Sequence, residues 1–309
     1  MHIELFFIPL VDINNELQTR AKTLLSEDEL AKITRYRAHK AQINGLQVRA
    51  ALRLVLSKMA TLDPKDWCFE YGPKGKPSLT AKQKQQTGLE FNLSHSGDWL
   101  LIGVVKHQDI SPCLLGVDIE RSRPKTDIYP ILNHYFSDQE TEALLALADE
   151  SAQRQRFFDL WALKESYIKA TGLGLAQSLK SFAFELTDLN LDNLSSDSGS
   201  LESTNLHNTN LEAQANTNPI GFIELKRFGV QQGAALEIRP TLPVYRDIRL
   251  HQLNTADPYC WQIYFGRLNL EYRFALSLAS AGANNPHAGY SALSTTLSMQ
   301  MLSVETLLN

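Results

Sequence analysis

The feature that most constrains the fold is an order of predicted elements that occurs twice along the chain. Each half begins with an apolar strand, continues with helices and ends with strands. Ser26 and Glu29 form a capping-box pattern that opens a helix in the first half, and Ser137 and Glu140 form the same pattern in the second. We therefore predict an α+β protein with two similar α/β lobes and an active-site cleft between them.

The expected bounds are as follows. Strands are predicted at 3–11, 89–93, 100–105, 114–120, 182–186, 221–228, 261–268 and 272–278, and the two long helices at about 42–59 and 151–170. Residues 187–219 are rich in Asn, Ser and Asp and contain no Lys or Arg, which predicts a mobile insertion. The predicted division is an N-terminal lobe at 1–110, a C-terminal lobe at 111–281 and a C-terminal tail at 282–309, with a weak amphipathic helix near its end.

Composition excludes several classes of protein. The 309 residues are 43% hydrophobic and 21% charged, so the chain is neither disordered nor collagen-like. Thirty Lys and Arg against 34 Asp and Glu leave no global basic field for nucleic acid or an anionic membrane. Three scattered cysteines indicate no disulfide framework and a reducing compartment. With no apolar run near the roughly 20 residues that span a bilayer and no signal-peptide pattern, we expect a cytoplasmic protein.

Three carboxylates are candidates for a metal site. Asp118 and Glu120 lie two residues apart at the end of an apolar strand, so both project from one face. Glu165 and Lys169 lie four apart on one face of the second long helix. Each pair alone also fits a solvated surface, but Asp118, Glu120 and Glu165 together would form a hard oxygen site suited to Mg²⁺. Lys164 and Lys169 would then meet phosphate charge.

The first half carries a separate basic set, whose members each also fit a solvated or locally paired side chain. These residues are Lys32, Arg49, Arg53, Lys76 and His95. His95 follows Ser94 in the segment Phe91-Asn92-Leu93-Ser94-His95-Ser96, where backbone N–H groups, a hydroxyl and an imidazole would all be offered to one phosphate.

Four motifs in this order resemble the 4′-phosphopantetheinyl transferases, specifically the long, surfactin-synthetase-type branch. They are Phe91-Asn92-Leu93-Ser94-His95-Ser96, Gly116-Val117-Asp118-Ile119-Glu120, Phe136-Ser137 and the segment from Trp161-Ala162-Leu163-Lys164-Glu165-Ser166 to Gly172-Leu173-Gly174-Leu175. The resemblance runs from about residue 20 to 186 and more loosely to 280. It implies a pseudo-twofold pair of lobes that bind coenzyme A between them and move its phosphopantetheine arm to a serine of an acyl-, peptidyl- or polyketide-carrier protein domain.

The resemblance also implies site roles. Asp118, Glu120 and Glu165 resemble the ligands of Mg²⁺, with Mn²⁺ the other option, and Lys169 resembles the lysine that faces the diphosphate. The residues that resemble the family's binding site for the adenosine 3′-phosphate are Ser94, His95, Lys76 and an arginine of the Arg49/Arg53 helix. Lys32 matches the family pattern least closely. The segment 71–77 is longer than the family pattern, so Lys74 and Lys76 compete for one role.

The mechanism expected from these roles needs a base and charge neutralisation, because a serine hydroxyl is neutral at pH 7 and the diphosphate is anionic. Glu165 is the first candidate base, directly or through a water, and Glu120 the second. A basic rim for an acidic carrier is expected at Arg121, Arg123 and Lys125 or at Arg154 and Arg156. A monomer would suffice. The alternatives are a Mg²⁺-dependent phosphohydrolase of coenzyme A or nucleotide diphosphates and a non-catalytic carrier-binding module.

Overall fold

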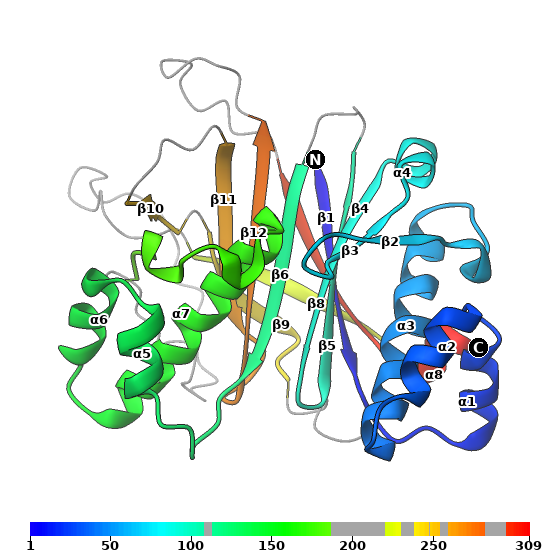
Figure 1. Ribbon diagram of the computed structural model, residues 1–309, viewed down its shortest axis with the longest axis horizontal. Coiled ribbons are helices and arrows are strands. Elements are labelled where there is room, and N and C mark those ends of the chain that lie inside the picture. The colour runs from blue at the N-terminus through cyan, green and yellow to red at the C-terminus, as the bar shows by residue number, and fades with distance from the viewer. Residues whose placement is uncertain (108–112, 187–219, 230–237, 247, 254–258, 282–294) are drawn as a thin grey trace, which may run out of the picture.

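The structure is a computed structural model (Figure 1), and it describes most of the chain. The described residues are 1–107, 113–186, 220–229, 238–246, 248–253, 259–281 and 295–309. The predicted insertion at 187–219 lies outside these residues. None of the helices in the described ranges is long and apolar enough to cross a membrane.

The first half follows the predicted order of strand, helices and strands. Its elements are β1 (His2–Pro9), α1 (Asn15–Lys22), α2 (Glu27–Thr34), α3 (His39–Met59), β2 (Phe69–Tyr71), β3 (Pro77–Leu79), α4 (Ala81–Thr87), β4 (Leu89–Ser96) and β5 (Trp99–Lys106). The capping box of Ser26 and Glu29 begins α2 as predicted. The β4–β5 hairpin is also confirmed, with Ser96 opposite Trp99 across the turn.

The second half repeats this order with additional strands. Its elements are β6 (Cys113–Arg121), α5 (Tyr129–Tyr135), α6 (Asp138–Leu145), α7 (Glu150–Thr171), β7 (Phe182–Phe184), β8 (Ile220–Phe228), β9 (Thr241–Tyr245), β10 (Leu250–Gln252), β11 (Tyr259–Arg267), β12 (Tyr272–Ala281), β13 (Thr296–Leu302) and α8 (Val304–Leu308). Ser137 and Glu140 form the predicted capping box of α6. Gly172, with φ +73°, ends α7 in the left-handed conformation that favours glycine.

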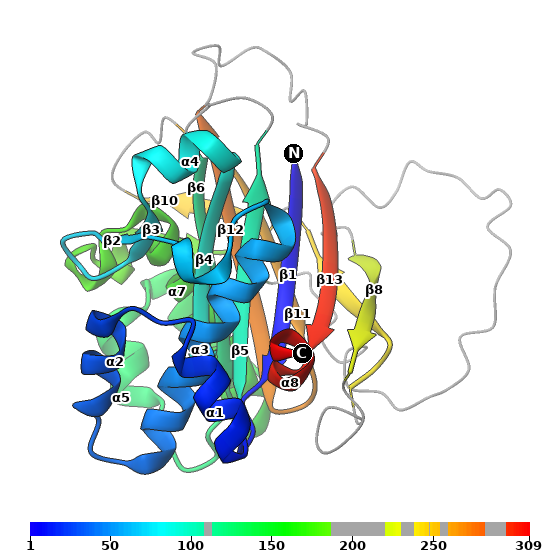
Figure 2. The same cartoon turned by 90° about the vertical axis from the view of Figure 1, so that its right-hand side faces the viewer.

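One sheet of nine strands joins the two halves. Its order is β4-β5-β1-β13-β8-β9-β11-β12-β6. The sheet curves until its two end strands, β4 and β6, lie beside each other, and side-chain hydrogen bonds rather than a backbone ladder link them (Figure 2). The sheet is therefore nearly closed, and the α+β class predicted from the sequence is confirmed.

Three apolar clusters follow from this arrangement. The inner faces of the strands form the first, which includes Leu5, Val117 and Phe274. The helices α1, α3 and α8 pack on the outer face of β1, β4 and β5 and form the second. The helices α5, α6 and α7 pack on the outer face of β11 and β12 and form the third. Figure 1 shows these two helical layers on opposite sides, with the sheet edge-on between them.

The prediction of a tail at 282–309 is wrong for residues 296–302. These residues form β13, which lies in the middle of the sheet, parallel to both β1 and β8. Met299 and Met301 are almost completely buried in the first cluster. The alternation in Thr-Leu-Ser-Met-Gln-Met-Leu is that of a half-buried strand, but the Asn- and Ser-containing sequence before it suggested a tail. A short terminal helix, α8, agrees with the prediction.

A buried ion pair occurs in the same place in each half. In the first half, Glu29 of the capping box pairs with Arg53 of α3 at 2.6 Å. In the second, Glu140 of the capping box pairs with Lys164 of α7 at 2.8 Å. The two partners are 24 residues apart in sequence in both pairs. Each cation also donates to carbonyls of the segment after its helix, those of Pro64 and Trp67 in one half and Leu179 and Phe182 in the other.

Candidate active site

Gly116 sets how closely α7 approaches β6. A Cβ atom at this position would lie 1.9 Å from the carbonyl oxygen of Ser166 and 2.4 Å from the amide nitrogen of Ala170. Only glycine, which has no Cβ, allows the helix backbone to rest on the strand here. The Ser166 hydroxyl also bonds to that of Ser277 on β12, at 2.7 Å, which fixes the helix along the sheet. This contact brings α7 side chains beside the end of β6.

Asp118, Lys169 and Ser94 meet at this point. The Lys169 ammonium lies 2.6 Å from Asp118 Oδ1 and donates to the Ser94 hydroxyl at 2.8 Å. The Ser94 hydroxyl donates to the same Asp118 oxygen at 2.7 Å. The three side chains come from β6, α7 and β4, so both halves of the molecule contribute. Asp118 is 3% exposed, and its second oxygen, Oδ2, is buried without a hydrogen-bond partner in the described part of the chain.

The carboxylates of Glu165, Glu120 and Asp118 act on one another. Burial raises the pKa of Glu165 to about 7, and the negative charge of Asp118 adds to this, while Lys169 opposes it. The pKa of Glu120 is also raised, first by burial and then by Asp118, against the charge of Arg123. Within the described residues, Glu165 makes no hydrogen bond or ion pair of its own. Three acidic groups therefore share one partly buried region with a single close lysine.

This set fits a hard divalent cation by type and charge. Carboxylate oxygens are the ligands that Mg²⁺ takes from proteins. Asp118 Oδ2, which has no hydrogen-bond partner among the described residues, is one oxygen that could bind the cation. Across the ranges the structure describes, however, no three His, Cys, Asp or Glu side chains already surround a common point. Asp118 Oδ1 faces Lys169, and Glu120 Oε1 faces Arg123 at 3.2 Å. The carboxylates are gathered, and sharing one ion requires rotation of their side chains.

The basic set of the first half lies partly around this region. His95 is exposed, and its pKa is lowered by partial desolvation and then by the positive charges of Lys169 and Arg49. Arg49 donates to the carbonyl of Gly45 in its own helix, at 3.0 Å. Lys32 lies over the Tyr71 ring, 4.0 Å from its centroid, next to the 72–76 loop. The charges of His95, Arg49 and Lys169 therefore lie close enough to influence one another.

Of the two competing lysines, Lys76 lies against the backbone of β6 and α7. The Lys76 ammonium donates to the carbonyls of Leu115 at 3.0 Å and Ala170 at 3.3 Å, which joins the 72–76 loop to β6 and α7. Burial lowers its pKa to about 8. An ammonium has three donors, so one is left for a phosphate. Lys74 is exposed, and its side chain lies beside Gly174.

The assignments of Arg53 and Lys164 as cofactor-binding residues are wrong. Arg53 is 2% exposed and is fully engaged with Glu29 and backbone carbonyls. Lys164 is 0% exposed, and its ammonium is enclosed by Glu140, two carbonyls and the rings of Phe136 and Phe182. Neither cation can reach a phosphate without breaking a buried ion pair. Helical spacing alone could not reveal which face of each helix is turned inward.

Ser94 is placed differently from its expected role. The residue is 7% exposed, and its hydroxyl serves Asp118 and Lys169 rather than an open phosphate position. Sequence reasoning also missed two neighbours on β4, Asn92 and Ser96, which are equally buried and bond to the backbone of β6. The sequence does indicate a polar face of this strand, because Asn92, Ser94 and Ser96 alternate with the residues of a mostly apolar face.

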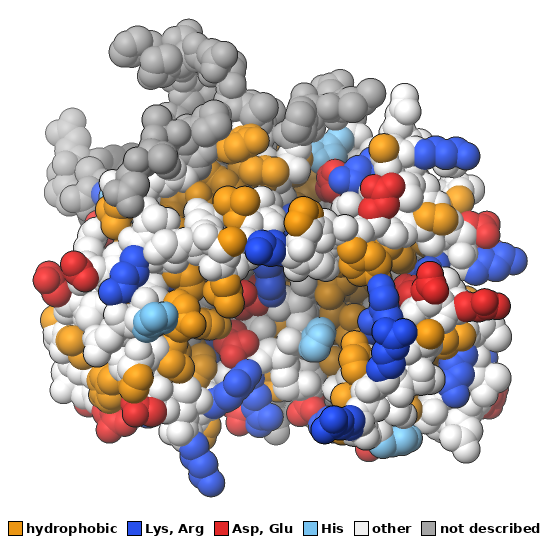
Figure 3. Space-filling view, in the orientation of Figure 1, with side chains coloured by type: hydrophobic (Ala, Val, Ile, Leu, Met, Phe, Trp, Pro, Cys, Tyr) orange, Lys and Arg blue, Asp and Glu red, His pale blue; other side chains and the backbone are white. Residues whose placement is uncertain are grey.

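The side chains expected to form a basic rim are mostly paired. Arg121 forms an ion pair with Glu271 at 3.0 Å and stacks on the Tyr272 ring. Arg154 donates to the carbonyl of Thr126 at 2.6 Å and pairs with Glu150. Figure 3 shows a furrow between the two helical layers, with acidic side chains and, below them, basic side chains on the α7 side, and a histidine and basic side chains on the α3 side.

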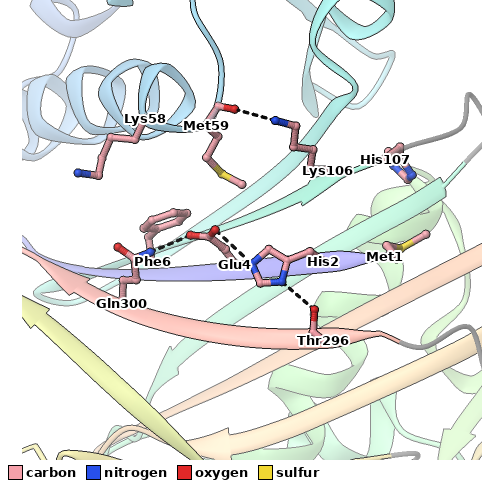
Figure 4. A pocket seen from close by; sticks show the side chains of 10 residues that line it. All are labelled: Met1, His2, Glu4, Phe6, Lys58, Met59, Lys106, His107, Thr296 and Gln300. Carbon is pink, nitrogen blue, oxygen red and sulfur yellow. Dashed lines mark hydrogen bonds and ion pairs between the residues drawn. The ribbon is translucent and has the colours of Figure 1, made fainter.

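A polar cavity of about 640 Å³ lies elsewhere, between β1, β13 and the end of α3 (Figure 4). Its polar side chains largely satisfy one another. His2 bonds to Thr296 at 2.8 Å and to Glu4 at 3.2 Å, and Gln300 donates to Glu4 at 2.8 Å. Lys58 also lines it. None of the predicted site residues does, so this cavity is not the site described above.

Comparisons with known proteins agree with the motifs. The family model of the 4′-phosphopantetheinyl transferase superfamily matches residues 114–221, and that of the 4′-phosphopantetheinyl transferase N-terminal region matches residues 13–107. The chain is similar to 4′-phosphopantetheinyl transferase HetI of Nostoc, with 36% identity over 175 residues, or 57% of this chain and 70% of HetI. It is also similar to Sfp of Bacillus subtilis, with 32% identity over 178 residues, or 56% of this chain and 72% of Sfp.

A third relative is a putative 4′-phosphopantetheinyl transferase of Synechocystis, with 34% identity over 158 residues. That match spans 51% of this chain and 61% of the relative, less than two thirds of its length. Together, the fold, the motifs and these matches identify the chain as a transferase enzyme. The chain belongs to the 4′-phosphopantetheinyl transferase family.

Proposed function

We propose that this protein transfers the 4′-phosphopantetheine group of coenzyme A to a serine of an acyl-, peptidyl- or polyketide-carrier protein domain and releases adenosine 3′,5′-bisphosphate. The observation that carries the proposal is the meeting of Asp118, Lys169 and Glu165 at the junction of β6 and α7, within motifs of this family. A positively charged lysine beside gathered carboxylates suits a reaction in which an anionic diphosphate is attacked and a bisphosphate leaves.

Asp118, Glu120 and Glu165 are the residues that would hold Mg²⁺, or Mn²⁺ in its place. When bound, the cation would supply Lewis-acid activation of the diphosphate and neutralise its charge. Burial first and the negative charge of Asp118 second raise the pKa of Glu120 and of Glu165, and the positive charge of a bound cation would oppose this rise. Lys169 would leave Asp118 and turn toward the diphosphate, where it would share the charge that develops on the leaving group.

Glu165 is the proposed base. A general base works best when its pKa lies near the operating pH, and the pKa of about 7 at Glu165 meets this condition before any cation binds. The Glu165 carboxylate would take the proton of the carrier serine, directly or through a water. Glu120, whose pKa is also raised, is the second candidate. The Glu120→Gln and Glu165→Gln variants distinguish them by which one abolishes transfer while retaining coenzyme A binding.

The adenosine 3′-phosphate would be held by residues of the first half. Arg49 and His95 are close enough for the arginine's charge to lower the pKa of the imidazole, so a phosphate between them would be attracted to both. Lys76 would add its third donor from its place against β6 and α7, and Lys32, which lies over Tyr71, would add a further positive charge. Arg49, and not Arg53, is therefore the arginine proposed for this role.

The two halves are proposed to be related by a pseudo-twofold axis, as in the long branch of the family. The matched ion pairs Glu29–Arg53 and Glu140–Lys164 support this relation. Residue numbers in the two pairs differ by 111, and the same difference relates Lys58 to Lys169. We further propose a monomer that works in the cytoplasm. Free cysteines at the exposed positions 68 and 260 are consistent with a reducing compartment.

An acidic carrier would dock beside the furrow between the two helical layers, near the turn after β6. Arg123 contacts Glu120, so its replacement would disturb the proposed metal ligands. Charge reversal at Arg121 and Lys125 is therefore the cleaner test. We expect it to raise KM for the carrier and to leave KM for coenzyme A unchanged. An equal rise in both constants would contradict docking at this turn.

Mass spectrometry of an apo carrier protein tests the function as a whole. Incubation with the protein, coenzyme A and Mg²⁺ should add one phosphopantetheine group to the carrier serine. A parallel incubation without carrier addresses the phosphohydrolase alternative, because a hydrolase would release adenosine bisphosphate there and a transferase would not. An unmodified carrier and intact coenzyme A in both incubations would leave the binding-module alternative.

A further inference from the structure

Among the described residues, the strand β6, which carries Asp118 and Glu120, has a backbone partner on one edge and none on the other. That partner is β12. The other edge faces β4, and side chains take the place of a backbone ladder. The amide of Val117 donates to the side-chain oxygen of Asn92 at 2.9 Å, and the amide of Arg121 donates to the hydroxyl of Ser96 at 3.2 Å. We call these two contacts the seam.

The two contacts of the seam follow a regular pattern. Asn92 and Ser96 lie on the same face of β4 and are 3% and 6% exposed. Each is 25 residues from its partner, so β4 and β6 run in the same direction with constant register. The two bonded amides lie just before Asp118 and just after Glu120. The side chain of Ser96 also interacts with that of Glu120. The seam therefore brackets the two carboxylates.

We propose that Asn92 and Ser96 are positioning residues that fix the backbone of β6 and so hold Asp118 and Glu120 where they can share a divalent cation. This inference rests on the proposed function. An edge strand with unpaired amides is free to twist or shift, and displacement of a catalytic group by about 1 Å can cost roughly a hundredfold in rate.

A purely structural role is the competing explanation, because a buried amide without an acceptor is unfavourable wherever it lies. A matched control separates the two explanations. Gln47 is also a buried amide side chain, 0% exposed, and its Nε2 donates to the backbone carbonyls of Val11 at 2.9 Å and Ile43 at 3.5 Å. It belongs to α3 and takes no part in the site. Gln47→Leu should cost stability without moving β6.

The experiment compares Asn92→Leu, Ser96→Ala and Gln47→Leu in the full-length protein. It uses four measurements: the melting temperature, hydrogen exchange of peptides that cover 114–121, the affinity for Mn²⁺ by electron paramagnetic resonance without coenzyme A, and kcat with KM for transfer. We expect both seam variants to exchange faster in 114–121, to bind Mn²⁺ at least tenfold more weakly and to lose at least tenfold in kcat. Gln47→Leu should lower only the melting temperature.

Two results would overturn the proposal on separate grounds. If the unaltered protein binds Mn²⁺ and the seam variants bind it equally well, the positioning role is refuted while the proposed function stands. If the unaltered protein binds no Mn²⁺ and modifies no carrier, the proposed function is refuted, and the role of the seam toward a metal falls with it. If Asn92→Leu fails to fold, Ser96→Ala still tests the positioning role, because it removes only one hydroxyl.

Discussion

Replacing Glu165 with glutamine is expected to stabilise the metal-free protein while it abolishes transfer. Glutamine has the shape of a protonated glutamic acid, so the variant retains packing and loses one of three neighbouring negative charges. In the folded protein the pKa of Glu165 is about 7, against 4.5 for an ordinary glutamate. At about 1.4 kcal/mol per pH unit, this difference corresponds to roughly 3 kcal/mol when the effect is assigned to Glu165 alone.

The measured gain should be smaller, since Glu120 lies in the same acidic group and can change its own protonation. We expect about 1–2 kcal/mol at pH 8, or a rise in Tm of roughly 2–4 °C. The sign follows from the raised pKa: the folded state holds a proton that the unfolded state releases between pH 4.5 and 7. Metal-free wild type therefore loses this part of its stability as pH rises through that window, and the variant does not.

The assay is thermal unfolding of wild type and Glu165→Gln at pH 4.5 and pH 8 with a chelator present, with Glu142→Gln as an exposed control on α6. The difference between wild type and variant should be near zero at pH 4.5 and fully present at pH 8. Mg²⁺ should stabilise wild type more than the variant, and transfer by the variant should fall by orders of magnitude. An equal Tm difference at both pH values would refute the electrostatic reasoning, and near wild-type transfer would remove Glu165 from the mechanism.

Three further predictions concern the packing around the site. Arg49→Ala should raise KM for coenzyme A at least tenfold with little change in Tm. Arg53→Met should instead lower Tm and leave KM for coenzyme A nearly unchanged. Steady-state kinetics measures the first quantity and calorimetry the second. Lys164→Met strands Glu140 as a buried charge and should cost about 3–5 kcal/mol in denaturant unfolding; a loss below about 1 kcal/mol would contradict this. Gly116→Ala should lower stability by about 3 kcal/mol and kcat more than tenfold, because its Cβ would push α7 away from β6.

The repeated order of elements explains why the fold class was accessible from the sequence. Capping boxes at Ser26 and Ser137 are local signals, because all of their partners lie within one helical turn. The same holds for the β4–β5 hairpin, whose strands are adjacent along the chain. Local hydrogen bonds and apolar periodicity therefore determined most helices and strands. They did not reveal β13, because its partners β1 and β8 are distant in sequence.

The two halves also differ in a way that the sequence did not disclose. One edge of β1 pairs with β13, whereas in the part of the chain that the structure describes the edge of β6 opposite β12 has no backbone partner and receives side chains from β4. Lys58 of α3 and Lys169 of α7 lie 111 residues apart, the same difference in number that relates the two buried ion pairs, and Lys169 lies against Asp118. The open edge of β6 is thus where the gathered carboxylates occur.

What the sequence by itself determined were the kinds of chemical group and their motifs: Asp118, Glu120, Glu165 and Lys169, with a spacing typical of one family. The tertiary structure decided which groups are accessible. Arg53 and Lys164 are of the same residue types as Arg49 and Lys169, but they face inward and form buried ion pairs there. Burial depends on which face of a helix meets distant strands, and no local pattern encodes that contact. The same dependence on distant contacts hid the seam that joins β4 to β6.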